Sequence, residues 1–178
     1  MLDAALYRYL RGRRVDVQAL AAELGVGRTT IYRWFGSREQ LLGEVVARAA
    51  EGVLEQIRAG TKGGGATRLL DIFDRFNRAL ADAPALRAFL EQERDTALRI
   101  ITSSGGVVTP RMVERIGEII DEEVQAGSYE PPVEVETLAY AIVRLAEAFI
   151  FNDAAVGIRG DVERLRDVEA AILRAVPG

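Results

Sequence analysis

Residues 19–42 of this 178-residue chain read ALAAELGVGRTTIYRWFGSREQLL, and they decide the fold. Apolar residues recur on one helical face up to Leu24, and GVG interrupts the pattern before a second short helix begins at Arg28. Ile31 and Phe35 are four residues apart, so they share a face that can pack against the first helix across the turn. Two short helices joined by such a turn form a helix-turn-helix.

The opposite face of the second helix is polar and aromatic. Burial of Ile31 and Phe35 directs the following residues outward: Arg28, Thr29, Thr30, Tyr32 and Arg33. Guanidinium groups bind phosphates and guanine edges, and hydroxyls bind phosphates or bases, so this face suits a DNA groove. Trp34 is three residues from Ile31, and it either lies partly in the core or reaches a phosphate.

The charge of the chain is unevenly distributed. Residues 1–50 contain eight arginines and five acidic residues, whereas residues 51–178 contain fifteen basic and twenty-two acidic residues. A basic head on an acidic body favours a polyanionic partner for the head alone. The chain has no Cys and no His, which excludes nucleophiles, zinc sites and disulfides built from them. We expect neither a cofactor nor a metal.

The rest of the chain has helical spacing and no alternating strand pattern, which predicts an all-α protein. About nine helices are expected, over residues 2–10, 17–24, 28–35, 38–59, 67–81, 84–102, 110–126, 133–155 and 162–176. Asp16, Ser37, Thr109 and Asp161 are their predicted N-caps. The predicted domains are a helix-turn-helix domain, residues 1–46, and a ligand-binding and dimerisation domain, residues 47–178. Without an apolar run of membrane-spanning length or a secretory leader, we expect a cytoplasmic protein.

Residues 2–48 resemble the DNA-binding segment of the TetR (tetracycline-repressor) family of transcriptional regulators. The similarity rests on LDAAL, AAELGV, YRWF and GSREQLL, in that order. It implies that Arg28 and the threonines after it touch phosphates or bases. It also implies that Tyr32, Trp34 and Arg38 reach backbone phosphates. The chain departs from the family in having almost no tail before the first helix, which Arg11, Arg13 and Arg14 could replace.

The segment TLAYAIVRLAEAFIF, residues 137–151, is apolar nearly all round. Such a helix is buried on several sides, which in a chain of this size indicates a subunit partner. The family resemblance implies a homodimer formed through the last two helices. A two-fold dimer presents its recognition helices about 34–36 Å apart and therefore reads a palindromic operator in double-stranded DNA.

The body also offers candidates for a ligand site. The aromatic candidates are Phe73, Phe76, Phe89, Tyr140 and Phe149, which form either an apolar pocket or ordinary core. Arg144 either pairs with Glu147 at the dimer contact or binds a ligand carboxylate or carbonyl. Residues 89–106 and 139–165 also resemble regulators of lactone (quorum-signal) degradation in actinobacteria, which implies a hydrophobic acyl or lactone effector.

These features predict a transcriptional repressor that a small hydrophobic effector releases from DNA. Two alternatives remain open from the sequence. One is an all-helical enzyme that acts on the same small molecule, and the other is a helical interaction module without DNA affinity. Turnover of a candidate lactone would favour the enzyme, and failure to bind its own promoter DNA would favour the interaction module.

Overall fold

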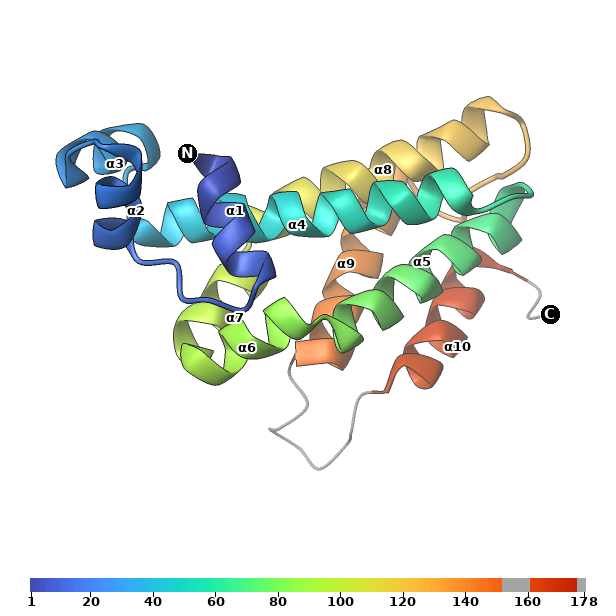
Figure 1. Cartoon of the computed structure of the whole chain (residues 1–178). Helices are drawn as coiled ribbons and strands as arrows, with labels where there is room; N and C mark the ends of the chain where they lie inside the picture. Colours follow the sequence, from blue (N-terminus) through green and yellow to red (C-terminus); the bar gives the residue numbers. More distant parts are fainter. Residues whose placement is uncertain (152–160, 176–178) are drawn as a thin grey trace. The chain divides into compact units, whose positions relative to one another are not determined.

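A computed structural model describes residues 1–151 and 161–175, and this part of the chain is all-helical (Figure 1). The described helices are α1 (Leu2–Leu10), α2 (Val17–Leu24), α3 (Arg28–Phe35), α4 (Arg38–Gly60), α5 (Gly65–Asp82), α6 (Pro84–Gln92), α7 (Arg94–Thr102), α8 (Val108–Gln125), α9 (Val135–Phe151) and α10 (Val162–Leu173). The all-α prediction is confirmed. The predicted end of the eighth helix, residues 152–155, and the predicted last residue of the ninth, 176, lie outside the described residues.

The helices form two compact units that alternate along the chain. Residues 1–50 and 82–110 form the first, called here the head unit, and residues 51–81 and 111–178 form the second, the body unit. α4 begins in the head unit and ends in the body unit. The head unit therefore contains the predicted helix-turn-helix together with α6 and α7, which follow it by more than thirty residues.

The helix boundaries in the head follow from local chemistry. The Asp16 side chain accepts a hydrogen bond from the Ala19 amide at 2.8 Å, and the Ser37 hydroxyl accepts one from the Gln40 amide at 3.1 Å. Gly25 ends α2 with φ of 64°, a conformation that side chains with a Cβ rarely adopt. Both predicted caps, and the glycine turn between the two short helices, are therefore confirmed.

Two details of the prediction were wrong. The single helix expected over residues 84–102 is two helices, because Glu93 leaves the helical conformation with φ of −146° and ψ of 52°. This break makes ten described helices instead of about nine. Thr109 does not precede α8 but lies within it, and its hydroxyl donates to the Ile101 carbonyl at 3.1 Å, which joins α8 to the end of α7.

In the head unit, α6 and α7 complete the core of the N-terminal helices. Phe89 of α6 meets Tyr9 of α1 edge to face, with ring centroids 6.0 Å apart. The Gln92 amide donates to the Gly12 carbonyl at 2.9 Å, and Arg99 of α7 pairs with Glu39 of α4 at 2.6 Å. The contacts reach α1, the segment after it and the start of α4, so α6 and α7 determine where these elements lie.

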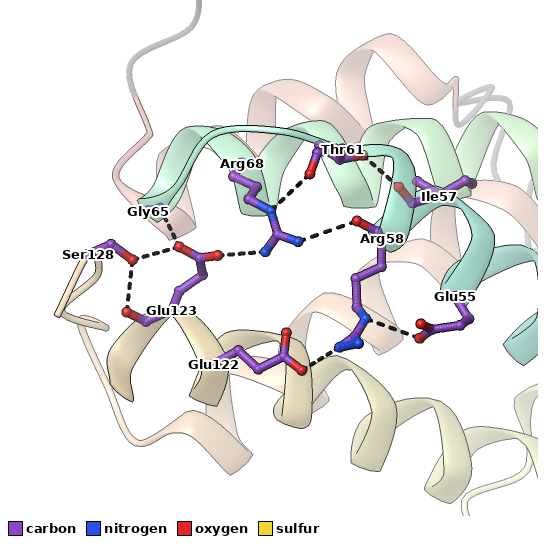
Figure 2. Close-up of polar contacts among 9 residues, drawn as sticks. All are labelled: Glu55, Ile57, Arg58, Thr61, Gly65, Arg68, Glu122, Glu123 and Ser128. Atoms are coloured by element: carbon purple, nitrogen blue, oxygen red, sulfur yellow. Dashed lines mark hydrogen bonds and ion pairs between the residues drawn. The ribbon is translucent and has the colours of Figure 1, made fainter. Parts of the chain in front are cut away.

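In the body unit, a buried charge network joins three helix ends (Figure 2). The Glu123 carboxylate, at the end of α8, accepts from the Arg68 guanidinium at 2.6 Å, the Gly65 amide at 2.5 Å and the Ser128 hydroxyl at 2.6 Å. Arg68 also donates to the Thr61 and Arg58 carbonyls, at 3.2 and 3.3 Å. The network thus fixes the end of α4 and the start of α5 against α8.

A second buried carboxylate of the body unit lies where α10 packs on α5. Glu169 is fully buried and accepts one hydrogen bond, from the Asn77 amide at 2.9 Å. Its other oxygen, Oε2, is buried without a hydrogen-bond partner. Asp74, one turn before Asn77, is engaged by Arg78 at 3.0 Å and lies 3.8 Å from Arg166.

No described helix is long and apolar enough to cross a bilayer.

Candidate nucleic-acid interface

The recognition helix α3 is held by one apolar side chain. Ile31 is 1% exposed, whereas Phe35 is half-buried. Gly27 caps the N-terminus of α3 in an extended conformation, and no side chain hydrogen-bonds the cap. The first amides of α3 therefore lack a capping side chain, and helix amides without partners attract anions.

The outward face of α3 is the predicted one. Arg28, Thr29 and Arg33 are exposed, and Thr30 and Tyr32 are half-buried. Trp34 is 54% exposed, so most of its indole lies outside the core. Both alternatives for Trp34, partial burial beside Ile31 and a phosphate contact, stay predictions.

The eight arginines of residues 1–50 fall into two sets. Arg8, Arg14, Arg38 and Arg48 each form an ion pair with a carboxylate. The other four, all exposed, make no ion pair with any residue of the described ranges: Arg11, Arg13, Arg28 and Arg33. Two of these lie on α3 and two lie between α1 and α2. Among residues 1–50, the unpaired positive charge is thus confined to the helix-turn-helix and the segment leading into it, while the head unit also exposes Arg87 and Arg94 of α6 and α7 without an ion pair among the described residues.

Arg38 differs from the other predicted DNA-binding residues. Its guanidinium donates to both oxygens of Glu93, at 2.7 and 2.6 Å, and to the Val15 carbonyl at 3.2 Å. The hydrogen bonds that Arg38 donates to Glu93 hold the pKa of Arg38 above its ordinary value, while burial opposes this in part. The Arg38 hydrogen bond likewise holds the pKa of Glu93 below its usual range, again with burial opposing. The pair is therefore ionised at neutral pH.

The predicted ligand residues lie in both units. Phe73 and Phe76 of α5 are buried in the body unit, and Phe149 of α9 is half-buried. Tyr140 of α9 is 48% exposed. Phe89 belongs to the head unit, where its ring packs on Tyr9. Its ligand role stays a prediction, with a structural role now visible beside it.

Arg144 lies on α9 with the carboxylate of Glu147 at 2.6 Å, and Glu147 is buried. This ion pair is one of the two alternatives that the sequence left open for Arg144, the other being a contact with a ligand. Within residues 1–151 and 161–175, no group of three or more acidic residues is placed to hold a metal ion.

Three buried or half-buried carboxylates with structural roles were not foreseen from the sequence: Glu93, Glu123 and Glu169. Glu123 and Glu93 appear in acidic runs, which are usually solvated helix faces. The one available signal is that Glu169 lies between apolar positions of α10, at Val168 and Ala170. Asn77 is far in sequence from Glu169, and Arg38 is far from Glu93, so residue spacing could not predict either pair.

The fold and the exposed basic face of α3 define a helix-turn-helix DNA-binding protein. Two family models match the chain: "Bacterial regulatory proteins, tetR family" over residues 11–45 and "Tetracyclin repressor-like, C-terminal domain" over residues 64–174. The chain belongs to the TetR family of DNA-binding transcriptional regulators.

Solved structures agree with this assignment. The R. erythropolis transcriptional repressor QsdR, of the TetR family, is 28% identical, with 99% of this chain and 94% of that chain covered and a TM-score of 0.91. The transcriptional regulator FadR from Bacillus subtilis, in complex with stearoyl-CoA, is 16% identical, with 99% and 97% covered and a TM-score of 0.51. Among curated proteins, none matches.

Proposed function

We propose that the chain is a homodimeric repressor that binds a palindromic operator through α3 and leaves it when a small hydrophobic effector binds the body unit. The observation that carries the DNA-binding part is the distribution of unpaired arginines. Of the eight in residues 1–50, the four without an acidic partner among the described residues lie in and just before the helix-turn-helix. Unpaired guanidinium groups need no ion pair to break before they meet phosphate.

The proposed roles on α3 follow from side-chain chemistry. Arg28 and Arg33 supply charge to phosphates or guanine edges, and Thr29 and Thr30 donate from hydroxyls. Tyr32 and Trp34 contact the sugar-phosphate backbone. Trp34 is suited to this because its ring is already exposed and its indole N–H is a donor only.

Dimerisation is proposed through α9 and α10. Tyr140 is the largest exposed ring of α9, and the same helix exposes Thr137 and Ala148. An exposed helix face that carries a large ring, in a family of two-fold symmetric regulators, supports pairing with its own copy. Such a dimer sets two copies of α3 about one DNA turn apart.

The test of DNA binding is selection from a random duplex library, followed by affinity measurements over a series of salt concentrations. The wild-type protein should enrich a two-fold symmetric sequence. Arg28→Ala and Arg33→Ala should each weaken binding to it, and a lost phosphate contact should reduce the salt slope by about 0.9. Lys62→Ala removes one exposed positive charge from the body unit and is the matched control.

Two outcomes of the selection would refute this part of the proposal. One is no enrichment over the doubly substituted Arg28→Ala, Arg33→Ala protein. The other is enrichment that both single variants retain in full. Either result would move DNA recognition away from α3.

The effector is proposed to be an acyl compound or lactone. This rests on the aromatic residues Phe73 and Phe76 of α5, on the stearoyl-CoA bound by FadR, which has a similar fold, and on the sequence resemblance to regulators of lactone degradation. The probes are stearoyl-CoA and a γ-lactone with an alkyl chain, each added to the complex with the selected duplex. Release of the duplex together with a raised unfolding temperature supports the class. Stable binding of the duplex at saturating concentrations of both probes contradicts it.

A further inference from the structure

The break between α6 and α7 occurs at a residue that ordinarily favours helix. Glu93 follows Gln92 and precedes Arg94, without Gly or Pro nearby, yet its ψ of 52° lies outside the helical range. A backbone that leaves the helix at a good helix former indicates that tertiary contacts fix it there. Those contacts belong to the side chain of Glu93.

The Glu93 carboxylate is the meeting point of three segments of the head unit. Arg38, the first residue of α4, grips both carboxylate oxygens, at 2.7 and 2.6 Å. Arg14, from the segment between α1 and α2, donates to the same carboxylate at 3.1 Å. Arg38 also donates to the Val15 carbonyl at 3.2 Å. One carboxylate thus joins the α6–α7 junction to the start of α4 and to the approach to α2.

The surroundings make this junction well defined. The side chain of Glu93 is 11% exposed and that of Arg38 is 26% exposed. A two-pronged arginine–carboxylate contact fixes orientation as well as distance, and partial exclusion of water strengthens it. On either side, the Gln92 amide holds the Gly12 carbonyl, and Arg99 pairs with Glu39.

The geometry has a direct consequence for the recognition helix. α3 ends at Phe35, and only Gly36 and Ser37 separate it from Arg38. A shift of Arg38 therefore displaces the C-terminal end of α3. In addition, the hydrogen bonds to Glu93 and Val15 use three of the five N–H groups of Arg38, so Arg38 can give a phosphate a two-pronged contact only by releasing one of these partners.

We infer that Arg38 is a positioning residue for DNA recognition, and that Glu93, at the α6–α7 junction, holds α3 in its DNA-binding orientation through it. This inference rests on the proposed function. It assigns the DNA contacts to the residues of α3 and gives Arg38 and Glu93 a shared task within the protein. Glu93 lies in the segment that the sequence predicts to be the ligand-binding and dimerisation domain, but it belongs to the head unit.

The test compares Glu93→Gln, Arg38→Ala and Arg38→Lys with wild type on the selected duplex and on a scrambled duplex. Glu91→Gln is the matched control, because Glu91 is an exposed carboxylate of α6 without an ion pair among the described residues. Circular dichroism of every variant checks that the helices form.

The positioning role predicts that Glu93→Gln and Arg38→Ala each lose about ten-fold in affinity for the selected duplex, and that the double variant loses little more. Binding to the scrambled duplex and the salt slope should stay as in wild type. Arg38→Lys should not restore binding, because lysine keeps the charge and lacks the fork. Glu91→Gln should bind like wild type.

A phosphate contact by Arg38 predicts the opposite pattern. Glu93→Gln would then match or exceed wild-type affinity, Arg38→Ala would reduce the salt slope by about 0.9, and Arg38→Lys would recover most of the binding. That result overturns the inference while leaving the proposed function intact. If the wild-type protein does not distinguish the two duplexes, the proposed function fails, and the inference fails with it.

Discussion

The arginines on the outer face of α3 and the arginine in the interior of the body unit differ in their partners. On α3, Arg28 and Arg33 are exposed and have no acidic partner in the described part of the chain. In the body unit, Arg68 is held by Glu123 and by two backbone carbonyls. A paired guanidinium stabilises a fold, whereas an unpaired one is available to a polyanion. The arginine of the body unit is therefore structural, whereas the two arginines of α3 remain accessible to a polyanion.

The largest expected effect on stability comes from breaking the buried charge network around Glu123 in the body unit. Glu123→Ala leaves Arg68 and the Gly65 amide without their acceptor, so we expect a loss of about 3–5 kcal/mol in the free energy of unfolding. Chemical denaturation measures it. Asp121→Ala, which removes an exposed carboxylate two residues away that has no ion pair in the described ranges, is the control and should change little. Equal stabilities for the two variants would contradict the role of the network.

The same network has a pH signature. Burial raises the pKa of Glu123, but hydrogen bonds from Ser128, Gly65 and Arg68 outweigh it, and the pKa falls below its ordinary value. A depressed folded-state pKa gives stability that is present above the unfolded value near 4.5 and is lost as the pH falls through the folded value. Glu123 thus contributes to the acid sensitivity of the fold.

The second expected effect concerns a buried carboxylate, Glu169, that forms no ion pair with any described residue. Burial raises the pKa of Glu169 to about 7, with the Asn77 hydrogen bond lowering it in part and Asp74 raising it further. The folded protein then keeps a proton that the unfolded chain releases above about pH 4.5. Stability should therefore fall between pH 4.5 and 7, by on the order of 3 kcal/mol, and level off above pH 7.

The measurement is the difference in unfolding free energy between wild type and Glu169→Gln from pH 4 to 8, which cancels the other titrating groups. Relative to the glutamine variant, wild type should lose stability as the pH rises through this window. Asp167→Asn, an exposed carboxylate of α10, should give no such difference. A flat curve for Glu169→Gln would show that the buried carboxylate has a normal pKa.

The third effect tests the outer face of α3. Trp34→Ala should change the free energy of unfolding by less than about 1 kcal/mol, because the ring is mostly exposed, yet it should weaken DNA binding several-fold. Ile31→Ala, on the same helix, should instead cost about 2–4 kcal/mol of stability, because its side chain is buried. If Trp34→Ala destabilises the protein as much as Ile31→Ala does, the Trp34 indole is part of the core.

Local chemistry made much of the head predictable from the sequence. Asp16, Gly25 and Ser37 act through bonds or backbone conformations within three residues of themselves, so their roles can be read from spacing. The exposure of Arg28 and Arg33 was also predictable, because helical spacing places them on the face opposite the buried Ile31.

What the sequence concealed depends on partners far along the chain. The helix breaks at Glu93 because Arg38, 55 residues earlier, donates hydrogen bonds to its carboxylate. The local sequence QERDTA contains no residue that predicts this break. Thr109 resembled a helix cap, yet it lies inside α8 with its hydroxyl on the Ile101 carbonyl. Phe89, whose ligand role stays a prediction, also packs its ring on Tyr9 in the head unit, a contact that spacing could not reveal. At Glu93 and Thr109, tertiary contacts overrode local propensity.

The smallest expected effect concerns the N-terminus of α3, which lacks a side-chain cap. Gly27 has φ of −74° and ψ of 147°, which any residue adopts, and a Cβ there would have only the Thr30 hydroxyl near it, at 3.9 Å. Gly27→Ser therefore places an acceptor beside the Thr30 amide without strain, and should stabilise α3 by a few tenths of a kcal/mol.

Amide hydrogen exchange in the first turn of α3 resolves so small a change, and Gly27→Ala separates the oxygen from the added Cβ. Slower exchange in the serine variant than in the alanine variant would show that the capping bond forms. Gly25→Ala, only two residues away, has the opposite expectation, since its φ of 64° disfavours a Cβ by about 1–2 kcal/mol even with open space around it. If both glycines tolerate alanine equally, the turn does not depend on the left-handed residue, and α3 is oriented instead by the contacts that hold Arg38.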